Sequence, residues 1–65
     1  MQLQVNGDTL VFDGETIADL LTRLEISGRR LAVEVNGDIV PKGEHGTSRL
    51  HDGDTIEIVH AIGGG

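Results

Sequence analysis

Apolar positions alternate with glutamines over residues 1–5. A period of two predicts a β-strand with one buried face, which here carries the apolar side chains. The dipeptide Asn6-Gly7 follows at once, and both residues accept the positive φ angles of a tight hairpin turn. We therefore expect residues 9–12 to return antiparallel to the first strand, with Leu10 and Phe12 on one face.

The spacing of apolar residues changes to that of a helix after residue 14. They recur at i, i+3, i+4 and i+7, on one stripe of a helix of two to three turns: Ile17, Leu20, Leu21 and Leu24. Thr16 is positioned to cap this helix, with Asp19 three residues later as its partner in a capping box. Asp19 and Arg23 stand four residues apart, which predicts a modest ion pair. We expect Gly28 to end the helix in the left-handed conformation.

The middle of the chain predicts a second hairpin and a loop. Residues 31–35 alternate like the first strand, and Asn36-Gly37 turns them into the short segment 39–40. Residues 42–48 are polar and contain two glycines. They are expected to form a surface loop with room for a single helical turn.

The last predicted strand covers residues 55–59, where Ile56 and Ile58 fall on one face. Residues 52–54 before it form a turn. The order hairpin, helix, strand, short strand, loop and final strand is typical of an α+β roll, with one helix packed across a mixed sheet of four to five strands. Because a short domain needs its ends tied into the sheet, we expect the first and last strands to pair in parallel at its centre.

Composition and charge narrow the classes of function. The 65 residues suffice for one domain, and its core must be aliphatic because the chain has one Phe and no Trp or Tyr. A net charge of -6 argues against nucleic acid and anionic membranes as partners and suits a basic protein. No apolar run approaches the roughly 20 residues that span a bilayer. The lack of cysteine excludes a thiolate nucleophile and fits a reducing, cytoplasmic location.

The sequence closes with a glycine run, which we interpret as a flexible tail of residues 62–65 held out by a domain of residues 1–61. A terminal glycine lacks a Cβ, so its carboxylate is unhindered and its backbone can enter a narrow channel. The candidate site residues are Gly65, as the reactive carboxylate, and Ile62, Gly63 and Gly64, as the part of the tail that threads into a partner's active site.

The remaining polar residues do not predict an active site. No nucleophile, base and oxyanion donor fall at a spacing that would bring them together, so we do not expect an enzyme. His45, His51 and His60 match no common zinc spacing, and we expect them at the surface rather than at a metal. Because the sequence lacks a Gly-x-x-x-x-Gly-Lys-Ser/Thr loop, the chain is not expected to bind ATP or another cofactor itself.

Four motifs follow one another along the chain: Val5-Asn6-Gly7; Ala32-Val33-Glu34-Val35-Asn36-Gly37 with Val40-Pro41; Leu50-x-Asp52-Gly53-Asp54-x-Ile56-Glu57-Ile58-Val59; and the final Gly64-Gly65. In this order the chain resembles the sulfur-carrier family of thiamin biosynthesis (ThiS). The resemblance covers essentially all of the chain, and it implies a ubiquitin-like β-grasp fold.

By this resemblance, an E1-like adenylating enzyme of the ThiF type would use MgATP to adenylate the Gly65 carboxylate. The step is needed because a terminal carboxylate, with a pKa of about 3.5, is an anion at neutral pH and resists nucleophiles. A cysteine desulfurase or another persulfide donor would then supply the sulfur of a thiocarboxylate. The thiocarboxylate would feed a thiazole synthase of the ThiG type, so the chain is expected to be a protein co-substrate.

Two alternatives remain open at this stage. The same chemistry could serve another acceptor, in molybdopterin synthesis or in ubiquitin-like modification of lysines. The chain could also be a β-grasp interaction module whose glycines take part in no reaction.

Overall fold

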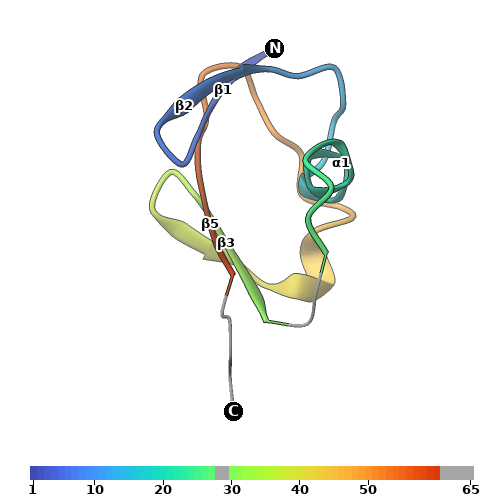
Figure 1. Ribbon diagram of the computed structural model, residues 1–65. Helices are drawn as coiled ribbons and strands as arrows, with labels where there is room; N and C mark the ends of the chain where they lie inside the picture. The colour runs from blue at the N-terminus through green and yellow to red at the C-terminus, as the bar shows by residue number, and fades with distance from the viewer. Residues whose placement is uncertain (28–29, 61–65) are drawn as a thin grey trace.

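The computed structural model describes residues 1–27 and 30–60. Within them the chain forms five strands, one α-helix and one turn of 3-10 helix (Figure 1). The elements are β1 (Gln2–Val5), β2 (Asp8–Val11), α1 (Ile17–Arg23), β3 (Leu31–Val35), β4 (Asp38–Val40), η1 (Lys42–Glu44) and β5 (Thr55–His60). Their order is the predicted one, and η1 is the single helical turn expected in the polar loop.

The strands form one mixed sheet in the order β2-β1-β5-β3-β4. Both hairpins are antiparallel and turn at an Asn-Gly pair, in which Asn6 has a φ of 48° and Asn36 a φ of 52°. Asparagine tolerates this left-handed conformation better than most residues, which explains its place at both turns. β1 and β5 pair in parallel, with β5 as the central strand. The α+β fold class and the parallel pairing of the first and last strands are therefore confirmed.

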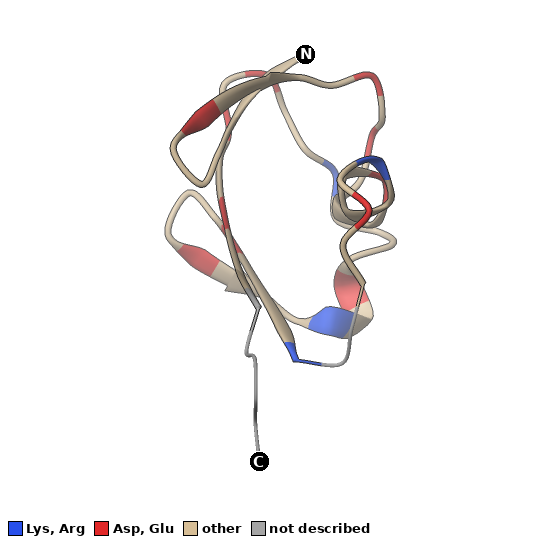
Figure 2. Cartoon of the chain, viewed as in Figure 1, with Lys and Arg blue, Asp and Glu red and all other residues tan. Residues whose placement is uncertain are grey.

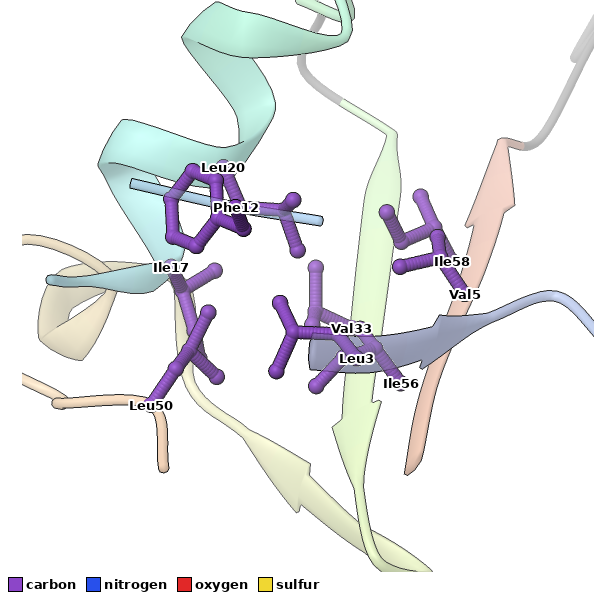
Figure 3. Close-up of a cluster of buried hydrophobic side chains, with 9 residues drawn as sticks. All are labelled: Leu3, Val5, Phe12, Ile17, Leu20, Val33, Leu50, Ile56 and Ile58. Atoms are coloured by element: carbon purple, nitrogen blue, oxygen red, sulfur yellow. The ribbon is translucent and has the colours of Figure 1, made fainter. Parts of the chain in front are cut away.

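One face of the sheet is covered by α1 and the connecting segments, and the described residues place no helix on the other face (Figure 1). The core lies between the sheet and α1, where apolar side chains from both layers meet (Figure 3). Leu50 is 4% exposed and anchors the segment before β5, and Phe12 is buried just beyond the end of β2. Met1, expected on the buried face, is 38% exposed because it precedes β1. The core residues are Leu3, Val5, Phe12, Ile17, Leu20, Val33, Leu50, Ile56 and Ile58.

The predicted capping box begins α1. The Thr16 hydroxyl accepts a hydrogen bond from the Asp19 N–H at 3.2 Å, and the Asp19 carboxylate accepts one from the Thr16 N–H at 3.1 Å. The same carboxylate oxygen accepts the Glu15 N–H at 3.0 Å. Asp19 is therefore engaged at the helix start. Among the residues that the structure describes, the ion pair predicted between Asp19 and Arg23 is not formed.

The helix ends in a Schellman motif built on Glu25. Glu25 has a φ of 57°, its N–H bonds to the Thr22 carbonyl at 3.1 Å, and the Ile26 N–H bonds to the Leu21 carbonyl at 2.9 Å. The prediction for Gly28 falls outside the described residues. The left-handed residue that closes α1 is instead Glu25, a choice that the preference for glycine at this position does not reveal.

His45 is buried, contrary to the surface position predicted for it. Its side chain is 7% exposed, and its Nε2 lies 3.1 Å from the carbonyl oxygen of Val40. The His45 main-chain oxygen accepts the Ala18 N–H at 2.9 Å, which links this turn to α1. η1, which ends at the preceding residue, packs against β3. His51 is exposed, as predicted.

Candidate functional site at the end of the central strand

The central strand β5 leads to the predicted site and has different neighbours along its length. β3 follows it throughout, from Val35 opposite Ile56 to Leu31 opposite His60. β1 accompanies only its first part, since the last aligned pair is Val5 with Ile56. Among the described residues, the second half of β5 therefore has a neighbouring strand on one side only.

The Asn6 side chain takes the place of the missing strand beside β5. Its Oδ1 accepts a hydrogen bond from the Ile58 N–H at 2.7 Å, and its Nδ2 donates one to the Ile58 carbonyl at 3.3 Å. The Asn6 main-chain N–H also bonds to the Ile56 carbonyl at 2.9 Å. A carboxamide has an N–H donor group and a carbonyl acceptor in the same plane, like a peptide group. Asn6 thus extends the ladder by one step after the chain has turned away.

A second asparagine holds the beginning of β5 from the opposite side. The Asn36 Oδ1 accepts the Thr55 N–H at 2.9 Å, and the Asn36 N–H bonds to the Thr55 carbonyl at 2.8 Å. The Asn36 Nδ2 donates to the Asp54 carboxylate at 3.0 Å, whose other oxygen accepts the His51 N–H at 2.8 Å. A turn asparagine therefore binds β5 at Thr55 and another binds it at Ile58.

The residues predicted as the site itself lie outside the described part of the chain. These are Ile62, Gly63, Gly64 and Gly65. Their roles, and the division into a domain of residues 1–61 and a tail of residues 62–65, stay predictions. Residues 61–65 follow β5 in the sequence, and β5 is held by β3, β1 and two asparagines.

The surroundings of β5 are acidic. The five described strands contain four acidic residues and neither Lys nor Arg. In Figure 2 the basic residues lie instead on α1, on η1 and in the connections. The acidic strand residues are Asp8, Glu34, Asp38 and Glu57.

Other chemistry in the described residues is limited. They contain no group of three His, Cys, Asp or Glu residues that could hold a metal ion. Among them one pKa is clearly displaced: the backbone N–H groups of Glu15 and Thr16 hold the pKa of the Asp19 carboxyl below its ordinary value of 3.8. Asp19 belongs to the helix start and not to the end of β5. No helix in the described part of the chain has the length and apolar character needed to cross a membrane.

The sequence reasoning missed the role of the two asparagines toward β5. It interpreted both as turn residues, which they are, but each also binds the central strand through its side chain. A signal was present, because Val-Asn-Gly occurs twice, at Val5-Asn6-Gly7 and at Val35-Asn36-Gly37. An Asn-Gly turn by itself requires no valine before it. The repeated valine is instead consistent with two motifs that both contact β5.

Residues 3–65 match the ThiS family. The chain belongs to this family. A ThiS relative from Bacillus subtilis, named a sulfur carrier protein, is 40% identical and is aligned over 97% of this chain and 98% of its own length. The crystal structure of a thiamine biosynthesis protein (ThiS) from Geobacter metallireducens superposes with a TM-score of 0.83 at 30% identity, over 100% of both chains. The ubiquitin-like β-grasp fold predicted for the chain is thereby confirmed.

The chain is also similar to part of two larger proteins. A thiazole synthase from Paramagnetospirillum magneticum is 42% identical over an alignment that covers 100% of this chain. A thiazole synthase from Magnetococcus marinus is 38% identical over the same share of the chain. The chain spans 20% of the length of each of these two relatives.

Proposed function

We propose that this ThiS family member is a sulfur carrier of thiamin biosynthesis and that it is the substrate of other enzymes. The observation that carries the proposal is the similarity to the sulfur carrier of Bacillus subtilis over 97% of this chain and 98% of that protein. The fold supports it, because the central strand leads directly into residues 61–65. The reactive group is then the carboxylate of Gly65.

The first step is activation of the carboxylate by an E1-like adenylating enzyme of the ThiF type. A carboxylate oxygen of Gly65 attacks the α-phosphorus of MgATP, pyrophosphate leaves, and an acyl-adenylate forms. The mixed anhydride removes the negative charge that repels nucleophiles and provides AMP as a leaving group. Because Gly64 and Gly65 have no side chains, they can follow a narrow channel to the nucleotide.

The second step transfers sulfur. The outer sulfur of a persulfide, on a cysteine desulfurase or another donor, attacks the acyl carbon and displaces AMP. The product is an acyl disulfide that keeps the sulfur–sulfur bond of the persulfide. A thiol then attacks the sulfur of the donor cysteine, forms a disulfide with it and releases the thiocarboxylate of Gly65. This chain contains no cysteine, so every thiol that takes part in these reactions comes from a partner. Such thiol chemistry fits a reducing compartment, and we place the carrier in the cytoplasm.

The thiamin pathway is favoured over molybdopterin synthesis by the comparison with larger proteins. Two thiazole synthases contain a segment similar to the whole chain. A carrier segment within a thiazole synthase supports the idea that this chain delivers its sulfur to an enzyme of that type, ThiG. The product would be the thiazole ring of thiamin.

Intact-mass spectrometry tests the proposal. The 65-residue chain is incubated with a ThiF-type enzyme, MgATP, a persulfide donor and a thiol. Exchange of one carboxylate oxygen for sulfur is the expected result. A ladder of larger conjugates would point to a ubiquitin-like modifier, and an unchanged mass would contradict the proposal.

A matched control uses the same chain with one alanine appended after Gly65. The extension moves the carboxylate away from the glycine pair and adds a side chain next to it. We expect no adenylation of the extended chain and an unchanged unfolding midpoint. Adenylation at the wild-type rate would show that Gly65 is not the reactive residue.

A further inference from the structure

The support that β5 receives from its neighbouring strands changes part-way along its length. Ile56 is paired with Val5 of β1 on one side and with Val35 of β3 on the other. From Glu57 to His60 the register of the described residues continues with β3 alone. Two-stranded ribbons twist more strongly than wider sheets. The direction in which β5 leaves the sheet therefore depends on what lies beside this second half.

Asn6 supports the second half of β5 with its side chain. Its Oδ1 and Nδ2 bond to the N–H and the carbonyl of Ile58 at 2.7 Å and 3.3 Å, and both contacts are partly buried. Asn6 is itself fixed, because its main-chain N–H bonds to the Ile56 carbonyl at 2.9 Å and its φ of 48° belongs to the hairpin turn. The carboxamide therefore keeps Ile58 where a third strand would keep it.

Asn36 makes a similar contact at a place where β5 needs less support. It stands in the same Val-Asn-Gly-Asp sequence as Asn6, has a φ of 52°, and accepts the Thr55 N–H on its Oδ1 at 2.9 Å. Thr55 begins β5 and is also paired with Gln4 of β1 on its other side. Loss of the Asn36 side chain therefore leaves that residue with a strand beside it, whereas loss of the Asn6 side chain leaves Ile58 with β3 alone among the described strands.

We propose that Asn6 is a positioning residue for the reaction of the Gly65 carboxylate. By holding β5 at Ile58, it fixes the direction of the last strand residues before any enzyme binds. An enzyme that receives residues 61–65 then does not have to order the end of β5 itself. Ordering the backbone of a single residue weakens binding by about tenfold, so this preorganisation is large enough to measure. The inference rests on the proposed function for the reaction, and it holds for whichever partner receives the segment.

The variant Asn6→Gly tests the proposal, because glycine keeps the positive φ of the turn and removes both bonds to Ile58. In the free carrier we expect the Ile58 N–H to exchange with solvent faster than in wild type. In pyrophosphate exchange with a ThiF-type enzyme and saturating MgATP, the KM for the carrier should rise about tenfold. The kcat should stay unchanged, because the cost of ordering β5 is met before the chemical step.

Asn36→Gly is the matched control, since it makes the same substitution in the same turn and should raise the KM far less. All three proteins are assayed at a temperature at which circular dichroism shows them folded. Equal KM values for wild type and Asn6→Gly would overturn the proposal, as would an equal rise in both variants, a lower kcat at an unchanged KM, or unchanged exchange of the Ile58 N–H. Normal activation of Asn6→Gly defeats this inference alone, whereas no activation of the wild type defeats the proposed function and this inference with it.

Discussion

The carboxamide of Asn6 makes both hydrogen bonds of a strand neighbour to the main chain of Ile58, at 2.7 Å to its N–H and 3.3 Å to its carbonyl. The two residues are 52 positions apart in the sequence. One side chain thereby joins the turn of the first hairpin to the strand that leads to the predicted site. Asn6 therefore serves both as a turn residue and as the hydrogen-bond partner of the Ile58 main chain in β5.

We predict that Asn6→Gly lowers the free energy of unfolding by about 1–3 kcal/mol, because it leaves two partly buried polar groups of Ile58 without their partner. Glycine retains the positive φ at this position, so the turn itself is preserved. Asn6→Asp keeps the acceptor for the Ile58 N–H and loses the donor to its carbonyl. Its free energy of unfolding should therefore lie between those of Asn6→Gly and wild type. Urea unfolding measures all three proteins. Equal midpoints for Asn6→Gly and wild type would show that the side-chain bonds contribute nothing.

The capping box predicts a pH dependence of stability. The N–H groups of Glu15 and Thr16 hold the pKa of Asp19 below its ordinary value of 3.8, so the carboxylate stabilises the fold above that value. This contribution is lost as the pH falls through the lower pKa of the folded state. Asp19→Asn should therefore be less stable than wild type at neutral pH, and the difference should shrink in acid. Urea midpoints measured from pH 7 down to about pH 2 test this, because a constant difference would rule out the titration of Asp19.

Glu25 occupies a left-handed position, with a φ of 57°. A side chain with a Cβ costs about 1–2 kcal/mol there, whereas glycine adopts the conformation freely. We expect Glu25→Gly to stabilise the protein by up to about 1 kcal/mol, less than the full strain because glycine also gains freedom in the unfolded chain. Glu25→Ala removes the charge but keeps the Cβ, so it should leave the midpoint nearly unchanged. A stabilisation of equal size in both variants would assign the effect to charge instead of backbone conformation.

The buried His45 is expected to stabilise the fold through the contact of its Nε2 with the Val40 carbonyl at 3.1 Å. His45→Phe keeps a ring of similar shape but has no polar atom for this carbonyl, and it should lose about 1–3 kcal/mol. His45→Ala also loses the packing of the ring and should be less stable still. Thermal unfolding of the three proteins orders them. A phenylalanine variant as stable as wild type would mean that His45 acts by filling space alone.

The proposed threading of the tail predicts different tolerances at neighbouring glycines. Gly64→Val places a branched side chain next to the reactive carboxylate and should slow adenylation on the order of 100-fold, since small misplacements of a reacting group have effects of this size. Gly63→Ala, one residue farther from the carboxylate, should be activated at nearly the wild-type rate. Pyrophosphate exchange with a ThiF-type enzyme measures both rates. Similar rates for Gly64→Val and Gly63→Ala would contradict a narrow channel around the terminal pair.

Local rules predicted most of the fold because the relevant interactions join residues close in sequence. The period of two over residues 1–5, the Asn-Gly turns and the Thr16 capping box all appear where short-range geometry places them. The end of α1 was missed for a related reason. Glycine is the residue that best tolerates a positive φ, so the sequence predicts Gly28 as the left-handed residue, whereas the hydrogen bonds of the last turn place Glu25 in that conformation.

The sequence by itself determined the α+β class, the order of the elements, the family and the residues proposed to react, since each depends on periodicity or on motifs read along the chain. Only the tertiary structure decided that Asn6 binds Ile58, that His45 is buried and that Glu34 faces Glu57. These relationships depend on the order and register of strands that are distant in sequence. Register is set when the whole core packs at once, and no local pattern contains it.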